Sequence, residues 1–204
     1  FGEETMSTTT APAPGKKPLP NESRPGYKHT KLGWMPKEWE VTCLGSICKI
    51  HSGGTPNKAN DFYWGGGIPW YTARDLKTDL LAESVYSVSE IGAERGSKII
   101  EAGAVLVLVR GMMLVKDIPC GITTVRSCFN QDIKALIPRK GVDHEFVLKW
   151  IKSFKFHLMS RVATSSHGTG NLPTDELKDF PIAIPPLPEQ RRIAQVLGAW
   201  DQAI

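Results

Sequence analysis

Hydrophobic residues recur at steps of three and four positions over the last segment of the chain. Residues 180–184, FPIAI, form a short apolar run that ends in prolines, and a periodic apolar pattern follows. This spacing predicts a short strand, a stop and then a long helix with one apolar side. Pro188 suits a first helical turn, and Glu189 meets the positive end of the helix dipole there. The predicted partner-contacting face consists of Ile193, Val196, Leu197, Trp200 and Ile204.

Other apolar patterns predict buried strands and a second helix. Residues 105–109, VLVLV, are a continuous branched run, which predicts a strand buried on both faces. Residues 121–125 and 133–137 predict further strands, the latter with alternating apolar positions. Asp143 is expected to cap one helix that continues to residue 162. Its apolar positions are Val147, Ile151, Phe154, Leu158 and Val162.

The basic residues of this helix, and a shorter helix after it, complete the predicted elements. We assign most of the basic residues to a solvated helix face; they are Lys149, Lys152, Lys155 and Arg161. A short helix is predicted over residues 175–178, with Thr174 as its cap.

This order of elements predicts an α+β fold: a single domain with a mixed, curved sheet and a few helices, followed by the start of a long C-terminal helix. Residues 1–26 are rich in Thr, Ala, Pro and Lys and have little to bury, so we expect a disordered tail there. The domain itself is expected over residues 27–186. Residues 187–204 are expected to begin the long helix.

Composition and charge narrow the class of protein only slightly. The chain has 204 residues, enough for one substantial core, and a net charge of +4 permits a phosphate-bearing partner without requiring one. Four cysteines show no zinc-ribbon spacing and five histidines are scattered, so we expect reduced thiols and no metal site. No apolar run is long enough to span a membrane and no leader pattern opens the chain, so we expect a cytoplasmic protein.

The sequence lacks the characteristic motifs of the catalytic classes that a protein of this kind could belong to. A methyltransferase would need a glycine-rich cofactor turn and an Asn/Asp-Pro-Pro-aromatic motif, and the chain contains neither. The carboxylates are dispersed rather than clustered around a site for Mg²⁺, and there is no Gly-x-Ser-x-Gly elbow. We therefore predict a binding protein with no catalytic residues.

Several polar loops are candidates for contact with an anion. Residues 52–58, SGGTPNK, form either a solvated connection or a phosphate-binding loop with Lys58. Residues 61–76 are dense in aromatics, which we assign to the scaffold, and they present Thr72 and Arg74. A guanidinium can bind a phosphate or the edge of a guanine, although Arg110, after a buried strand, could equally form a salt bridge.

Five short motifs resemble the target recognition domain of specificity subunits of type I restriction–modification systems. The resemblance covers residues 27–204, and it is carried most strongly by residues 185–190, PPLPEQ, before the predicted helix. The other matching motifs are residues 33–39 (GWMPKEW), 44–45 (LG), 67–76 (GIPWYTARDL) and 130–131 (NQ). We assign Asn130 and Gln131 to tying down loops rather than to reading adenine. Full-length members of the family carry two such domains, whereas this chain contains one.

The resemblance implies sequence-specific binding to one half of a bipartite double-stranded DNA target. It also implies modification and restriction subunits as partners, and these would hold S-adenosylmethionine, ATP and Mg²⁺. Our candidates for DNA contact are Lys58, Thr72, Arg74, Lys98, Arg110, Lys116, Arg126 and His167, with Thr72, Arg74 and His167 as base readers. The alternative is a protein-interaction or assembly module that acts through its exposed C-terminal helix, for example with a second copy of the chain or a second recognition domain.

Overall fold

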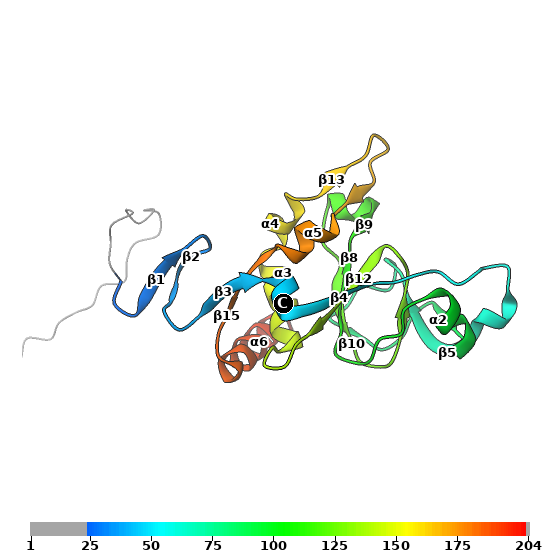
Figure 1. The fold of residues 1–204 in the computed structure, drawn as a ribbon, viewed down its shortest axis with the longest axis horizontal. Coiled ribbons are helices and arrows are strands. Elements are labelled where there is room, and N and C mark those ends of the chain that lie inside the picture. Colours follow the sequence, from blue (N-terminus) through cyan, green and yellow to red (C-terminus); the bar gives the residue numbers. More distant parts are fainter. Residues whose placement is uncertain (1–23, 203–204) are drawn as a thin grey trace, which may run out of the picture. The chain divides into compact units, whose positions relative to one another are not determined.

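A computed structural model describes residues 24–202 of the chain (Figure 1). The chain divides into two units, residues 1–37 and residues 38–204. The described part of the first unit is an antiparallel hairpin of β1 (Tyr27–Thr30) and β2 (Gly33–Pro36). Of the predicted tail over residues 1–26, residues 1–23 lie outside the described part.

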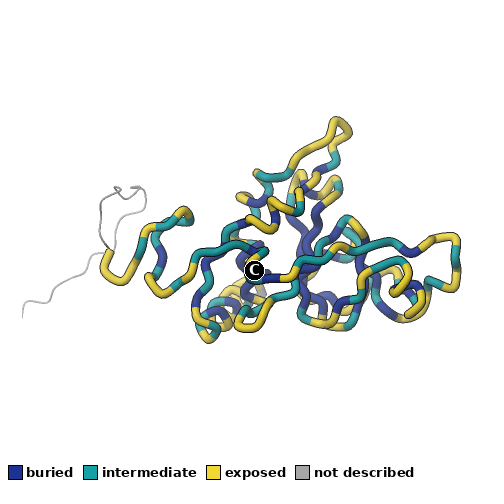
Figure 2. Tube along the Cα trace, in the orientation of Figure 1, coloured by how far each residue is buried: buried dark blue, intermediate teal, exposed yellow. Residues whose placement is uncertain are grey.

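A five-stranded sheet is the centre of the second unit, with the strand order β4-β12-β8-β10-β6. All its pairs are antiparallel except β10 with β6, which makes the sheet mixed. All four residues of β8 are buried, as the continuous apolar run predicts (Figure 2). The strands are β4 (Cys48–Ser52), β6 (Leu80–Leu81), β8 (Val105–Leu108), β10 (Cys120–Thr123) and β12 (Ile133–Pro138).

Three smaller sheets surround this centre, so the predicted α+β class with mixed pairing is confirmed and the strands are shared among several sheets. One contains β5 (Trp64–Tyr71), β7 (Tyr86–Val88) and β11 (Cys128–Phe129). Another contains β9 (Arg110–Gly111), β13 (Ala163–Thr164) and β14 (Gly170–Asn171). The last pairs β3 (Glu40–Cys43) with β15 (Pro181–Ile184).

Of the two longest helices, α3 packs on the central sheet and α6 packs on α3. Helix α3 contacts β8, β10 and β12, and α6 packs against α3 (Figure 1). The helices are α1 (Leu44–Ile47), α2 (Glu90–Gly96), α3 (His144–Ser153), α4 (Lys155–Met159), α5 (Thr174–Lys178) and α6 (Leu187–Gln202). Two 3₁₀ turns are η1 (Asp61–Tyr63) and η2 (Met112–Val115).

Two of the predicted helix boundaries are wrong. Asp143 caps α3 as expected, since its Oδ1 accepts a hydrogen bond of 3.0 Å from the Phe146 N–H. The predicted single helix to residue 162 is interrupted at Phe154, whose backbone (φ −105°, ψ 18°) leaves the helical region, and α4 follows. Thr174 is the first residue of α5 rather than its cap, and Pro173 occupies the cap position without a side-chain hydrogen bond.

The PPLPEQ motif anchors the start of α6 to the rest of the domain. Gln190 is only 1% exposed, and its Oε1 accepts a hydrogen bond of 2.9 Å from the Asp143 N–H. Its Nε2 donates to the carbonyls of Gly141 (3.1 Å) and Pro185 (2.9 Å). One buried amide therefore joins the cap of α3, the loop before it and the segment after β15.

A second contact joins two sequence motifs that lie 150 residues apart. The Trp39 indole N–H donates to Glu189 Oε2 at 3.2 Å, so the end of the GWMPKEW motif meets the PPLPEQ motif. Both motifs thus contribute to how α6 leaves the domain.

The basic residues of the α3–α4 region form ion pairs, so their assignment to a solvated face is wrong. Lys149 is 8% exposed, and its Nζ donates to Asp79 (2.7 Å) and to Asp201 of α6 (2.6 Å). Lys152 also pairs with Asp79. Burial raises the pKa of Asp79, but the hydrogen bonds from both lysines outweigh it, and the pKa lies below its ordinary value. The two remaining pairs are Lys155–Asp117 and Arg161–Glu176.

We expect Lys149→Met to lower the free energy of unfolding by roughly 1–3 kcal/mol at pH 7, because it leaves Asp79 and Asp201 without their shared partner. The measurement is urea denaturation followed by circular dichroism. A carboxylate with a lowered pKa stabilises the fold above its unfolded pKa and loses this effect as pH falls through its folded pKa. The difference between wild type and variant should therefore shrink below about pH 4.

Lys178→Met is the matched control, because its ion pair with Asp175 is on the surface. This change should alter stability by less than about 0.5 kcal/mol. Equal stability of Lys149→Met and wild type would contradict a stabilising role for the buried pair.

Candidate nucleic-acid interface

Three basic side chains from different elements gather beside the central sheet. Lys134 of β12 lies opposite Ser52 of β4, and its Nζ donates to the Ser52 hydroxyl. Burial lowers the pKa of Lys134, and the nearby charges of Arg110 and Lys178 lower it further. Among residues 24–202, only Lys178 of the three has a carboxylate within ion-pair distance, at Asp175. The cluster of Arg110, Lys134 and Lys178 thus carries a net positive charge, and a bound anion would reduce the repulsion between its cations.

The small sheet of β9, β13 and β14 carries two of the predicted DNA-contacting residues, Arg110 and His167. Arg110 of β9 is paired with Asn171 of β14, and His167 lies in the loop that connects β13 to β14. That loop is closed by the Thr169 N–H, which donates to Ser165 Oγ at 3.2 Å. Lys116 follows η2, which packs against β14, and it is exposed. The structure therefore places Arg110, His167 and Lys116 on the same small substructure.

The loop after β5 is organised by one carboxylate. Asp75 Oδ2 accepts hydrogen bonds from the N–H (2.7 Å) and hydroxyl (2.8 Å) of Thr72, while Oδ1 accepts one from the Val85 N–H (2.9 Å). Thr72 Oγ1 also accepts from the Arg74 N–H. Thr72 thus shapes the loop, and Arg74 is exposed with no ion pair within the described part of the chain.

Arg126 is engaged by acidic residues of its own chain. Its guanidinium donates two hydrogen bonds to the carboxylate of Glu90, at 2.7 and 2.8 Å, and Glu101 lies 4.0 Å away. The hydrogen bond from Arg126 lowers the pKa of Glu90. The arginine is consequently less available to a DNA phosphate than the other candidates.

Lys98 belongs to a separate shallow pocket that also contains His51 and His144. Burial lowers the pKa of His51, and the positive charges of Lys98 and Lys49 lower it further. Lys98 is also an exposed cation, and the residues that line its pocket do not include Arg110, Lys134 or Lys178.

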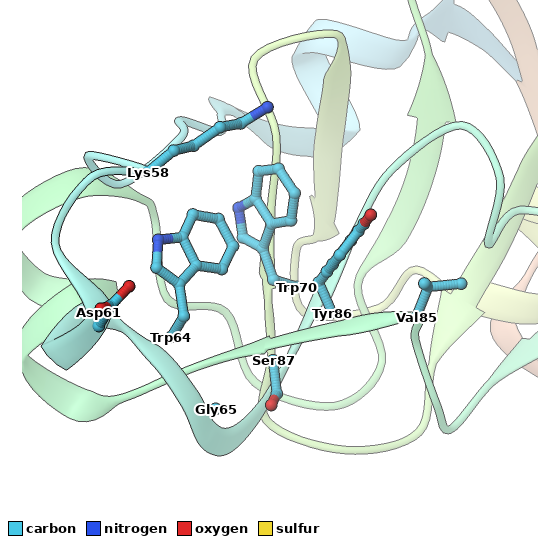
Figure 3. A pocket seen from close by; sticks show the side chains of 8 residues that line it. All are labelled: Lys58, Asp61, Trp64, Gly65, Trp70, Val85, Tyr86 and Ser87. Atoms are coloured by element: carbon cyan, nitrogen blue, oxygen red, sulfur yellow. The ribbon is translucent and has the colours of Figure 1, made fainter.

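The loop of residues 52–58 packs against the backbone of its neighbours. The Gly54 N–H donates to the Phe129 carbonyl at 3.0 Å, and a Cβ on Gly53 would come within 2.2 Å of that oxygen. Thr55 donates to Gln131 Oε1 at 2.6 Å. Gly53 is needed for this close approach. Lys58, at the end of the loop, lines a pocket with aromatic walls (Figure 3).

Asn130 has the structural role that we predicted for it. Asn130 is buried; its Oδ1 accepts a hydrogen bond from the Asp132 N–H and its Nδ2 donates one to the Asp132 carboxylate. Gln131 likewise holds the Thr55 loop. Lys134 and Lys178 are not among the residues predicted from the sequence. The position of Lys134 between inward-facing residues of β12 could have indicated Lys134. No local signal in the sequence places Lys178 near Lys134.

The second candidate surface is the outer side of α6. Ala194 and Gly198 belong to the side that faces the domain, while Val196, Leu197 and Trp200 are exposed, Trp200 by 70%. Ile193, Val196 and Leu197 line a shallow groove together with Pro188, Glu189 and Arg192. Ile204 lies outside the described residues.

The cysteines are free, and burial raises the pKa of Cys48 and Cys120 to about 12 and that of Cys128 to about 11. These thiols are therefore protonated near neutral pH. Over residues 24–202, no group of three or more His, Cys, Asp or Glu residues is arranged to hold a metal ion. No helix in that range has the length and apolar character needed to cross a membrane.

The sequence profile of the family described as the type I restriction modification DNA specificity domain matches residues 36–204. The chain belongs to this family. It is 29% identical to the specificity subunit of the type I restriction enzyme EcoR124I/EcoR124II of Escherichia coli, over 86% of the chain and 44% of that protein. It is also 29% identical to the MjaIX specificity subunit of Methanocaldococcus jannaschii, over 87% of the chain and 41% of the relative. The chain thus spans less than half the length of these relatives.

Solved structures share the fold. The HsdS subunit of Thermoanaerobacter tengcongensis superimposes with a TM-score of 0.64 at 21% identity, covering 88% of this chain and 41% of that one. A chain from a study of complex assembly and conformational transition of the type I R-M system gives a TM-score of 0.66 at 22% identity, covering 91% of this chain and 41% of that one.

We expect Arg110→Gln to raise the pKa of Lys134, because it removes one of the two positive charges that lower it. The pKa can be followed by NMR of the lysine side chains across an alkaline titration. Arg74→Gln serves as the control and should leave the Lys134 pKa unchanged. If Arg110→Gln has no effect either, the two cations are not close in solution.

Proposed function

We propose that this domain binds double-stranded DNA sequence-specifically and recognises one half of a bipartite target, as part of a type I restriction–modification specificity subunit. The observation that carries the proposal is the family match over residues 36–204, together with the cluster of Arg110, Lys134 and Lys178. Phosphates placed at this cluster would relieve its like-charge repulsion and fix the register of the domain on the duplex.

The remaining candidates divide into contacts that the geometry favours and contacts that it does not. Exposed cations are suited to phosphates, and Arg74, on a loop braced by Asp75, is suited to a base edge. The ion pair of Arg126 with Glu90 and the internal hydrogen bonds of Thr72 make these two residues weaker candidates. The exposed cations are Lys58, Lys98, Arg110 and Lys116, and His167 is exposed in its hairpin loop.

The assembly that we propose around this chain rests on its relatives. In it, modification subunits methylate DNA with S-adenosylmethionine, and a restriction subunit uses ATP and Mg²⁺. The chain itself would be a non-catalytic recognition component, acting in the cytoplasm. Two relatives are named as specificity subunits and one structural neighbour comes from a study of assembly, which supports this arrangement.

A protein-interaction role is the second candidate, and the exposed apolar side of α6 favours it. In this case Val196, Leu197 and Trp200 would contact another helix, from a second recognition domain or a second copy of the chain. Salt separates the two roles, because affinity for DNA falls steeply with the logarithm of salt concentration and an apolar helix contact does not.

Arg110→Ala and Lys134→Ala should each weaken binding to cognate and scrambled duplexes alike, because phosphate contacts carry no sequence information. Each change should also reduce the slope of log affinity against log salt by about 1. Fluorescence anisotropy with labelled duplexes at several salt concentrations measures both quantities. Arg126→Ala is the matched control, and its ion pair with Glu90 predicts a smaller change. A slope that is unchanged in both cluster variants would contradict the proposal.

Arg74→Ala should relax discrimination at one base pair, at a cost of roughly 1–3 kcal/mol on the cognate duplex. Selection from a randomised duplex pool, followed by binding of single-substitution duplexes, identifies the position. An equal loss on cognate and scrambled DNA would make Arg74 a phosphate contact instead.

A further inference from the structure

Three aromatic side chains of the sheet of β5, β7 and β11 form the walls of an open pocket (Figure 3). The rings of Trp64 and Trp70 have centroids 5.1 Å apart and an interplanar angle of 89°. Tyr86 lies 6.4 Å from each of them, at 76° and 64°. The pocket has a volume of about 530 Å³, within the usual range for a small-molecule site. Tyr86 is 49% exposed, so an occupant can reach the rings from solvent.

The polar atoms of the two indoles are already used inside the domain. The Trp64 N–H donates to the Asn57 carbonyl at 3.2 Å, and the Trp70 N–H donates to the Gly54 carbonyl at 2.9 Å. The indoles therefore offer ring carbons rather than hydrogen-bond donors to an occupant. Gly65 also lines the pocket, and its φ of +79° favours glycine, so this wall carries no side chain.

Charged groups at the pocket define which occupant fits. Lys58 extends above the rings, and Asp61 lies on the other side of Trp64 (Figure 3). Neither has an ion pair with another residue in the described part of the chain. An aromatic ligand with a phosphate next to it would use the aromatic walls and Lys58, since the ring contacts the walls and the phosphate contacts Lys58. A methylated ammonium group would suit the walls and the Asp61 carboxylate, but the Lys58 charge disfavours it.

Hydrogen bonds connect this pocket to the Arg74 loop. The Ser84 hydroxyl accepts a hydrogen bond from the backbone N–H of Trp70 at 3.0 Å and donates one to the Tyr86 carbonyl at 2.6 Å. The adjacent Val85 N–H donates to Asp75, the carboxylate that shapes the Arg74 loop. The pocket wall and the proposed base-reading loop are therefore parts of one hydrogen-bonded structure.

We propose that the pocket of Trp64, Trp70 and Tyr86 holds one unpaired nucleobase of the bound DNA, with Lys58 contacting the neighbouring phosphate. This inference rests on the proposed function, because it makes the pocket part of the same DNA-binding surface. Contact with the aromatic walls offsets part of the cost of unpairing a base, and the base most easily unpaired would be favoured.

NMR of the indole N–H groups tests the pocket directly in the full chain. The Trp64 and Trp70 resonances are assigned from Trp64→Phe and Trp70→Phe, and a five-nucleotide single-stranded DNA is the probe. Both resonances should shift on titration, while that of Trp150, which donates to the Pro181 carbonyl on another part of the domain, should not.

Variants then separate the walls from the cation. Tyr86→Ala should weaken binding of the oligonucleotide roughly fivefold to a hundredfold, and Lys58→Ala should weaken it and reduce its salt dependence. The matched control is Phe62→Ala, since this aromatic is 86% exposed beside the pocket and does not line it. Lys58 is on the surface, so its variant remains informative even if Tyr86→Ala does not fold.

Two comparisons would overturn the inference. An abasic oligonucleotide that shifts the same indoles as strongly would show that no base enters the pocket. Tetramethylammonium that shifts them while DNA does not would identify a cation cage instead. Duplex binding is measured in parallel. If the chain binds the duplex but the oligonucleotide does not shift the indole resonances, the pocket assignment is contradicted and the proposed DNA recognition is not. Indoles shifted by the oligonucleotide without any duplex binding would contradict the proposed function and support the pocket.

Discussion

The side-chain amide of Gln190 joins three parts of the chain at one buried point. It bonds to the backbone at Asp143, Gly141 and Pro185, so the cap of α3 and the segment after β15 share a partner. Losing this side chain would leave buried backbone groups unpaired, which is costly in an interior. Together with the Lys149–Asp201 ion pair, it fixes both the start and the last described turns of α6 to the domain.

This attachment decides which side of α6 remains available. Small residues, Ala194 and Gly198, allow the helix to approach the domain, and they leave the apolar residues Val196, Leu197 and Trp200 on the other side. The domain thus presents two separate surfaces with different chemistry. One is a set of cations around β9, β12 and α5, and the other is an apolar helix side; the first suits a polyanion and the second suits a helix.

Local patterns in the sequence were sufficient for much of the fold. The continuous run of β8 and the Asp143 cap depend on neighbouring residues, so periodicity and capping rules predicted them. Ion pairs depend on residues far apart in the chain. Lys149 meets Asp79 70 residues away and Arg126 meets Glu90 36 residues away, and no spacing rule reveals such partners. For the same reason the sequence indicates each cation only by itself, and the grouping of Arg110 with Lys134 and Lys178 depends on the three-dimensional fold.

Hydrogen–deuterium exchange of the chain, free and bound to a duplex selected from a random pool, tests the central claim most directly. We predict slower exchange on binding in the β9–β14 sheet, in the Arg74 loop and in the loop of residues 52–58, with α6 unchanged. Slower exchange confined to α6, or no change in any of the three regions at saturating duplex, would contradict it.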